Sequence, residues 1–403
     1  MISTNRNMCS GISRRTALKG VASVAVAAGF APVRSAIGQI APVKVGFLLP
    51  YSGTYAALGN NITEAFKLHV EERGGKLGGR PVEYVAVDDE SDPGKAADNT
   101  NKLVTRDKVD VIVGTVHSGV QLGVSKVARD TNSLLIIPNA GVNAATGGLC
   151  ASGIFRSSFS NWQPGYPMGR VMVERGHKRA VTLTWKYAGG EEILGGFKEG
   201  YEKAGGKVVE ELYLPFPNTE FQALLTKIAE IKPDAVFVFF AGGGAVKFVK
   251  DYHAAGLRKS IPLYSTGFLT DGTLKAQGEA AEGLLTTLHY GDGLNTPKDN
   301  AFRTAFEARG KGETDVYAVQ GYDAAQMLAA GLDAVKGDVG ARADLVRGIE
   351  RATIDSPRGP FTVGKNHNPI QDIYLREVKN GKNIVVGVAA KALMDPGRGC
   401  KLA

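Results

Sequence analysis

The chain has 403 residues, a hydrophobic fraction of 43% and a formal net charge of +8. At about 150 residues per domain this length predicts two domains, and the hydrophobic fraction can fill both cores. The basic residues form no cluster interleaved with aromatic side chains, which argues against nucleic-acid binding. No stretch reaches the roughly 18 consecutive apolar residues of a membrane-spanning helix.

Residues 1–38 have the composition of an export signal. They hold five basic residues and no acidic one, then an apolar run and a small-residue site at Ala36 and Gly38 of the kind that signal peptidases cleave. The Arg14-Arg15 pair looks like a twin-arginine signal, and an ordinary secretory signal is the alternative. Either predicts a periplasmic protein whose remaining formal net charge is +3.

Beyond residue 38 the chain holds two cysteines, Cys150 and Cys400. In an oxidising compartment an even pair favours a disulfide, here one that ties the C-terminal tail to the body of the protein. Two free, buried thiols are the alternative. No CxxC motif or zinc-ligand pattern is present.

Short β-branched runs alternate with amphipathic stretches in the first part of the chain. Strands are expected at 43–49, 81–87, 110–114 and 134–137, and helices from Ile62 to Gly74, over 94–105 and around Val120 to Val127. This alternation predicts a parallel, doubly wound sheet with helices on both faces.

The same rhythm starts again after residue 160. Strands are expected at 180–184, 207–212, 235–240 and 262–265, and helices at 191–204, 221–231 and 245–255. A break at 288–292 is typical of a return crossing between domains. A helix over 315–335 and a hairpin-like stretch over 373–386 are expected after it.

The search for a binding site begins at the turns after predicted strands, because parallel sheets bind ligands beyond the carboxyl ends of their strands. Two neighbouring turns carry candidate contacts: His117, Ser118, Asn139, Ala140 and Gly141. Ser118 is placed to cap a helix, and its hydroxyl with nearby amides could hold a carboxylate. A plain serine N-cap is the alternative.

Two further turns lie in the second half. Gly242 begins a run of three glycines between a strand and a helix, but it lacks the Gly-Lys-Ser/Thr of a nucleotide loop. The glycines more simply make room in a cleft or allow a tight turn. Tyr187 and Trp185 could supply a ring wall, and a core role is the alternative for Trp185.

The sequence gives no indication of catalysis. It has no GxSxG or HExxH motif, and its six histidines form no metal-ligand pair. The acidic cluster Asp88-Asp89-Glu90 fits a solvated strand end better than a metal site. We therefore expect no enzyme activity, no metal and no cofactor.

Several short segments, taken together, resemble a known family. They are Leu48–Gly53, Gly74–Gly79, Asp88–Pro93, Val113-Gly114 with Ser118, Ile137–Ala140, Phe155–Ser158, His253–Gly256 and Glu282–Leu284. In this order they resemble the branched-chain amino-acid (leucine/isoleucine/valine) type of periplasmic binding protein, with the type I fold. The resemblance covers nearly the whole chain after residue 38.

The resemblance implies an α/β protein of two doubly wound, parallel-sheet lobes joined by three crossings. The expected lobes are residues 43–160 plus 290–350 and residues 161–289 plus 351–396. A monomer of this kind closes on a small molecule and delivers it to the permease and ATPase subunits of an ABC importer. A sensor that presents its ligand to a membrane receptor is the alternative.

The resemblance also implies site residues. Ser118 and the Asn139–Gly141 turn would bind a ligand carboxylate, with Tyr187, Gly242 and Thr266 on the opposing lobe. Amino-acid binders of the family usually carry a carboxylate where Thr266 stands, and segment 156–163 is similar to relatives that import aromatic carboxylates. We therefore predict an aromatic acid as ligand, with a branched-chain amino acid as the alternative.

Overall fold

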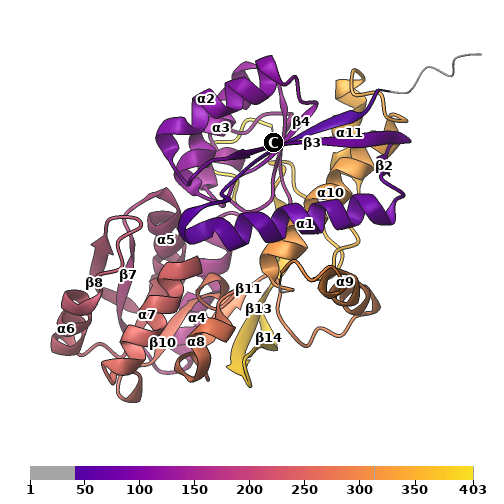
Figure 1. The fold of residues 1–403 in the computed structure, drawn as a ribbon. Coiled ribbons are helices and arrows are strands. Elements are labelled where there is room, and N and C mark those ends of the chain that lie inside the picture. Colours follow the sequence, from indigo (N-terminus) through magenta and orange to yellow (C-terminus); the bar gives the residue numbers. More distant parts are fainter. Residues whose placement is uncertain (1–40, 313, 403) are drawn as a thin grey trace, which may run out of the picture. The chain divides into compact units, whose positions relative to one another are not determined.

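The computed structural model describes residues 41–312 and 314–402, so the expected export signal lies outside the described residues. Strands and helices alternate along the chain and form two sheets covered by helices, which confirms the predicted α/β class (Figure 1). Within the described part of the chain, no helix is both long and apolar enough to span a membrane.

The first sheet contains the strands of the first 156 residues. They are β1 (Val43–Leu49), β2 (Lys76–Leu77), β3 (Arg80–Asp88), β4 (Val111–Gly114), β5 (Leu134–Ile137) and β6 (Ile154–Arg156). Their order is β2-β3-β1-β4-β5-β6, with β1 parallel to both β3 and β4 and β2 antiparallel to β3. The central strands are continuous apolar runs because helices cover both faces.

Six helices of the described chain belong to this half. They are α1 (Ala56–Glu72), α2 (Ala96–Asn101), α3 (Ser118–Asp130), α9 (Pro297–Ala308), α10 (Val316–Ala334) and α11 (Arg342–Arg351). The expected helix over 94–105 is α2 followed by a π-helical turn, Lys102–Arg106. The expected helix over 315–335 is α10, with Asp315 as its N-cap.

The second sheet contains the remaining strands. They are β7 (Arg179–Trp185), β8 (Lys207–Leu214), β9 (Ala235–Phe239), β10 (Leu263–Thr266), β11 (Leu285–Leu288), β12 (Thr362–Val363), β13 (Pro369–Lys379) and β14 (Lys382–Leu393). The order is β12-β13-β11-β10-β9-β7-β8, with β14 paired to β13. Because β13 runs antiparallel to β11, the sheet is mixed rather than wholly parallel as expected.

Helices also cover the second sheet. They are α4 (Trp162–Glu174), α5 (Ala188–Lys203), α6 (Gln222–Ile231), α7 (Gly242–Ala254) and α8 (Leu274–Gln277). Short 3-10 turns lie at Gly53–Tyr55, Pro93–Lys95, Asn143–Thr146, Leu257–Lys259, Gly267–Leu269 and Gly278–Ala281.

The pattern did not predict α4, whose Pro164 and Pro167 look like helix breakers. Its packing against α5 explains why the helix forms. A Cβ on Gly169 would lie 2.2 Å from the Tyr201 amide nitrogen, so the two backbones approach closely.

The chain passes between the two halves at 157–161, 289–296 and 352–361. The first and third crossings are tied together by Arg358, which donates to the carbonyls of Ser157 (2.6 Å) and Ser158 (3.4 Å). Its guanidinium also lies 3.4 Å from Asp323 of α10, and both side chains are buried. The crossings are therefore held as one unit by buried polar contacts.

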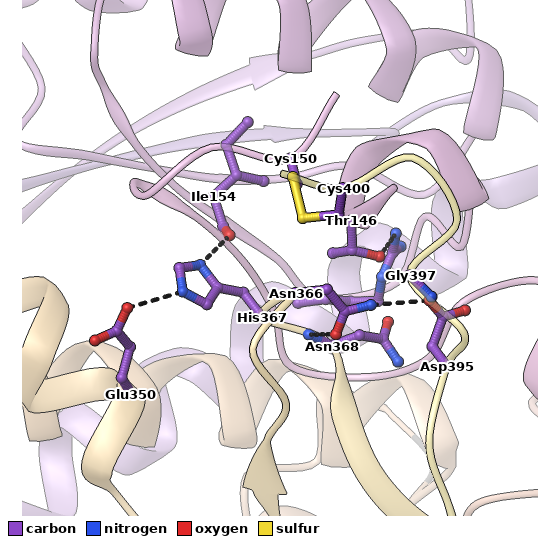
Figure 2. Close-up of a disulfide and its surroundings, with 11 residues drawn as sticks. Thr146, Cys150, Ile154, Glu350, Asn366, His367, Asn368, Asp395, Gly397 and Cys400 are labelled. Atoms are coloured by element: carbon purple, nitrogen blue, oxygen red, sulfur yellow. Dashed lines mark hydrogen bonds and ion pairs between the residues drawn. A yellow bond between two sulfur atoms is a disulfide. The ribbon is translucent and has the colours of Figure 1, made fainter. Parts of the chain in front are cut away.

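A disulfide joins Cys150 and Cys400 across 250 positions of sequence (Figure 2). The tail that leads to Cys400 is anchored further, because Asp395 accepts hydrogen bonds from Asn366 (2.9 Å) and the Gly397 amide (2.8 Å). Arg398 pairs with Glu199 of α5 at 2.9 Å. The C-terminal tail therefore contacts elements of both halves.

We predict that the purified, exported protein carries this bond. Closing so long a loop restricts the unfolded chain, and its loss should lower stability by up to about 5 kcal/mol. Intact-mass analysis after alkylation without reductant should find no modified thiol. Reductant should lower the melting temperature of the wild type but not that of the C150S/C400S variant. Two alkylated cysteines would contradict the prediction.

Candidate functional site

A pocket of about 320 Å³, part of it open to solvent, lies at the carboxyl ends of strands from both sheets. The first half contributes Tyr55, Leu58, Val116, Ser118, Asn139, Gly141, Phe159, Asn161 and Tyr317. The second contributes Tyr187, Ile193, Phe239, Ala241 and Phe268. Four of the predicted site residues are thus brought together: Ser118, Asn139, Gly141 and Tyr187.

Aromatic rings form most of the pocket wall. The Phe159 and Phe268 rings have centroids 4.7 Å apart, and Phe239 meets Phe268 edge-on at 6.1 Å. Tyr187 lies 6.4 Å from Phe239, and Tyr317 lies 6.2 Å from Phe268. Rings at these separations can stack on or meet the edge of a flat aromatic ligand.

Ser118 is the first residue of α3, and His117 rather than Ser118 is the helix cap. The Val120 amide donates to Nδ1 of His117 at 3.4 Å. The Ser118 hydroxyl is therefore not used for capping, contrary to expectation. Its oxygen accepts a hydrogen bond from Nδ2 of Asn161 (3.3 Å), which leaves its proton available to a ligand.

Gly141, in the turn after β5, presents a free amide. The Ala140 amide, which we expected to contact the ligand, instead donates to the Thr115 carbonyl at 2.9 Å. Buried Arg156 donates to the carbonyls of Ala140 and Val142. Since the C=O and N–H of a trans peptide point in opposite directions, this turns the Gly141 N–H away from Arg156. That N–H donates to none of the described residues.

The N-terminus of α5 lies beside Ser118. A Cβ on Gly189 would be 2.9 Å from Oγ of Ser118 and 2.8 Å from the Tyr187 ring. No side chain caps this helix, so its first amides remain unpaired. The N-terminal ends of α3 and α5 thus converge on Ser118, and both favour negative charge there.

Asn161 was missed as a site residue, and its partner Glu192 explains its orientation. Asn161 Nδ2 donates to Glu192 at 2.8 Å as well as to Ser118. Glu192 also accepts from the Asn143 amide at 2.8 Å. Burial raises the pKa of Glu192, and these hydrogen bonds oppose the shift. Glu192 itself does not line the pocket.

Tyr187 is held by two neighbours. Its hydroxyl lies 3.3 Å from that of Tyr55, so one of the two donates to the other and one proton remains for a ligand. The ring of His117 stacks on Tyr187, with centroids 4.6 Å apart. Burial lowers the pKa of His117 to about 4, with Asp92 opposing the shift, so the ring is neutral at physiological pH. His117 supports the wall from behind and does not line the pocket.

Besides His117 and Ala140, two more predicted residues lie outside the pocket. Gly242 has φ of +56°, and a Cβ there would be 2.2 Å from the Thr54 carbonyl. The space we expected to hold a ligand ring is filled by that backbone, and Ala241 lines the pocket instead. Thr266 is fully buried at the end of β10, and Phe268, two residues later, provides the contact surface.

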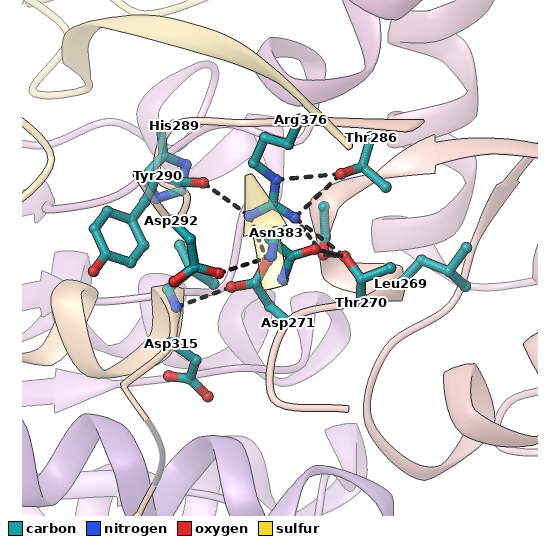
Figure 3. A network of polar contacts seen from close by, with 12 residues as sticks. Leu269, Thr270, Asp271, Thr286, His289, Tyr290, Asp292, Asp315, Arg376 and Asn383 are labelled. Carbon is teal, nitrogen blue, oxygen red and sulfur yellow. Dashed lines mark hydrogen bonds and ion pairs between the residues drawn. The ribbon is translucent and has the colours of Figure 1, made fainter. Parts of the chain in front are cut away.

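A buried ion pair contacts the backbone beside two of the aromatic residues of the pocket. Arg376 and Asp271 lie 2.6 Å apart (Figure 3), and Arg376 also donates to the Gly267 carbonyl, next to Phe268. The other Asp271 oxygen accepts from the amide of Val316 (3.1 Å), next to Tyr317. The Tyr317 hydroxyl is buried without a partner among the described residues and is free to meet a ligand.

None of the lining residues carries a charge at neutral pH. Across residues 41–312 and 314–402, no group of three or more His, Cys, Asp or Glu side chains is arranged to hold a metal ion. The pocket therefore offers hydroxyl and amide donors between aromatic walls, an arrangement suited to binding.

Comparison with known proteins agrees with this architecture. A family model described as periplasmic binding protein matches residues 42–383. The chain is 31% identical over 369 residues to the Leu/Ile/Val-binding protein homolog 6 of Brucella melitensis biotype 1, covering 89% of this chain and 90% of the relative. The chain therefore belongs to the periplasmic binding protein family.

Solved structures define the class further. The chain is 50% identical to an ABC-transporter solute-binding protein from R. palustris in complex with benzoate, with a TM-score of 0.88 over 90% of this chain and all of that one. A solute-binding protein from Rhodopseudomonas palustris BisB5 in complex with 3,4-dihydroxybenzoic acid is 30% identical, with a TM-score of 0.83 over 88% and 99% of the two chains. This protein is accordingly a solute-binding protein of an ABC transporter and not an enzyme, which confirms the sequence-based prediction.

We predict that Gly242→Ala weakens ligand binding although Gly242 does not line the pocket. The added methyl would collide with the Thr54 carbonyl and keep the second half away from the first. Calorimetry should show an affinity loss of at least about tenfold. Gly243→Ala is the matched control, since its Cβ meets only the Thr54 side chain, at 3.3 Å. Equal affinities of the two variants would contradict the prediction.

Proposed function

We propose that the protein binds an aromatic carboxylate of the benzoate kind in the periplasm and delivers it to an ABC importer. The observation that carries this proposal is the composition of the pocket. Its walls are aromatic, its polar groups are uncharged, and no acidic side chain lines it. Ser118, the Gly141 amide and the two helix ends supply donors for the carboxylate, and the rings accommodate the arene.

The same composition disfavours an amino acid. The α-ammonium group of leucine would have to leave water without a carboxylate partner, at a cost of several kcal/mol. The nearest candidate, Glu192, already accepts hydrogen bonds from Asn143 and Asn161 and lies outside the lining. The name of the Brucella relative, a Leu/Ile/Val-binding protein homolog, makes the branched-chain amino acids the second candidate.

Solved relatives support the first candidate. The structure at 50% identity holds benzoate, and the structure at 30% identity holds 3,4-dihydroxybenzoic acid. In the proposed cycle the two lobes, residues 43–160 with 290–350 and residues 161–289 with 351–396, close on such an acid. The permease and ATPase subunits of the importer are the proposed partners.

We predict that calorimetry on refolded, ligand-free protein will detect benzoate or hydroxybenzoates with micromolar dissociation constants or tighter. Leucine, isoleucine and valine should give no heat of binding because of the unpaired ammonium. Tight binding of leucine together with absence of binding by every benzoate tested would overturn the proposed function.

Ser118→Ala should weaken binding of the acid about 10- to 100-fold, the effect of losing a hydrogen bond to a charged group. In the absence of ligand, the melting temperature of the variant should be nearly the same as that of the wild type. Ser260→Ala, at an exposed serine outside the pocket, is the control and should bind as the wild type does. Unchanged affinity of the Ser118 variant would remove Ser118 from the carboxylate site.

We also propose that residues 1–38 direct export by the twin-arginine route, on the basis of the Arg14-Arg15 pair and the following weakly apolar run. Replacing both arginines with lysine keeps the charge and should leave the protein in the cytoplasm. Cell fractionation measures the outcome, with an unchanged chain as control. Normal export of the lysine variant would contradict this route.

A further inference from the structure

The hydrogen-bonding character of Asn139 is set by residues outside the pocket. Asn139 lines the pocket, and its Nδ2 donates to Oε1 of Gln320 at 2.7 Å. Its Oδ1 has no partner among the described residues and is not one of the fully covered polar atoms. The side chain therefore offers the pocket an acceptor, although the sequence favoured a contact to a carboxylate.

Gln320 contacts His289 at its other end, so the direction of these hydrogen bonds depends on the tautomer of His289. Gln320 lies fully buried on α10, and its Nε2 is 3.2 Å from Nε2 of His289. With Oε1 of Gln320 accepting from Asn139, its amide protons face the imidazole. His289 Nε2 must then be the acceptor, which leaves the proton of the neutral ring on Nδ1.

The surroundings of His289 keep its ring neutral. It is buried at the second crossing, next to Phe159 of the pocket wall, with ring centroids 5.6 Å apart. Burial holds its pKa well below the ordinary value, and the positive charges of Arg358 and Arg376 lower it further. The ring therefore stays neutral, and only the choice of tautomer decides the direction of the hydrogen bonds toward Asn139.

An acceptor at this position repels a carboxylate and matches a hydrogen-bond donor. The Ser118 hydroxyl, the Gly141 amide and the helix ends already supply donors for the acid group. A ligand that also satisfies Oδ1 of Asn139 must carry a hydrogen-bond donor, and on a phenolic acid that donor is a ring hydroxyl. Leaving Oδ1 unpaired in a closed pocket would cost part of the binding energy.

We propose that Gln320 and His289 are positioning residues that turn the carbonyl oxygen of Asn139 into the pocket, where it accepts a hydrogen bond from a ring hydroxyl of the bound acid. The inference rests on the proposed function and narrows its ligand class to hydroxylated benzoates. The pair acts through Asn139 and does not itself line the pocket.

The test measures the ratio of the affinity for a hydroxybenzoate to the affinity for benzoate. A substitution that only disturbs the structure should weaken the binding of both ligands alike and leave this ratio unchanged. Calorimetry with benzoate and with 2-, 3- and 4-hydroxybenzoate should find one hydroxylated isomer bound about tenfold more tightly than benzoate by the wild type. Asn139→Leu should bring the ratio close to one while benzoate is still bound. Gln320→Met and His289→Phe should lower the ratio, and His289→Phe retains a ring against Phe159.

Gln326→Met is the matched control, a glutamine of the same helix that donates to Asp323 and has no contact with Asn139. It should keep the wild-type ratio. A second measurement requires no variant: the side-chain ¹⁵N spectrum of His289 in the wild type should show the proton on Nδ1.

The outcomes separate the two proposals. If benzoate binds and no hydroxylated isomer binds more tightly, the inference about Asn139 is wrong and the proposed function stands. If neither benzoate nor any hydroxybenzoate binds, the proposed function fails, and the inference fails with it. A wild-type ratio in both Gln320→Met and His289→Phe, or a proton on Nε2 of His289, would overturn the positioning role.

Discussion

The ion pair between Arg376 and Asp271 is the interaction on which the geometry of the pocket depends. Both side chains are buried, so removing either would leave an uncompensated charge, at a cost of about 3–5 kcal/mol. Arg376 comes from β13 and also donates to the Tyr290 carbonyl (2.8 Å) at the second crossing. Asp271 accepts a hydrogen bond from the Val316 amide at the start of α10. One pair thus joins the second sheet, a crossing and the helix that carries Tyr317.

A second constraint, for the proposed aromatic acid, is the binding of an anion without a lining cation. A lysine or arginine in the pocket would bind a carboxylate strongly but would be buried unpaired in the ligand-free protein. Here the cation is placed one peptide away, since Arg156 binds the backbone of the turn and orients the Gly141 amide. Burial lowers the pKa of Arg156 to about 10, so it remains charged at neutral pH. Neutral donors and helix ends then complete the site.

The sequence was sufficient to predict most strands, most helices and several of the turns that line the pocket. Periodicity and the rule that ligands bind beyond strand ends identified the turns of Ser118, Gly141 and Tyr187, all of which line the pocket. The same rule locates a turn but not the residue within it that faces the ligand. It therefore led to the prediction of Gly242 and Thr266, whereas the residues that line the pocket at these two turns are Ala241 and Phe268.

Other site residues could not be predicted because their role depends on contacts between distant segments. Asn161 matters because α5 brings Glu192 to it, and Tyr317 because Asp271 holds the adjacent amide. Neither residue follows a predicted strand, and although Asn161 lies in the family-like segment 156–163, that resemblance does not show which of its side chains faces a ligand. The prolines of α4 likewise concealed a helix that exists because glycines let it pack closely on α5.

The division of the donors between two sheets would explain how the proposed acid is released. Ser118 and the Gly141 amide belong to the first half, whereas Tyr187 and the amides of α5 belong to the second. When the halves separate, the carboxylate keeps only part of its donors, and the ring loses the wall on one side. The open form must therefore bind more weakly than the closed form, and the ligand stabilises closure by that same difference in free energy. An importer that holds the two halves apart would lower the affinity without having to compete for any charged group.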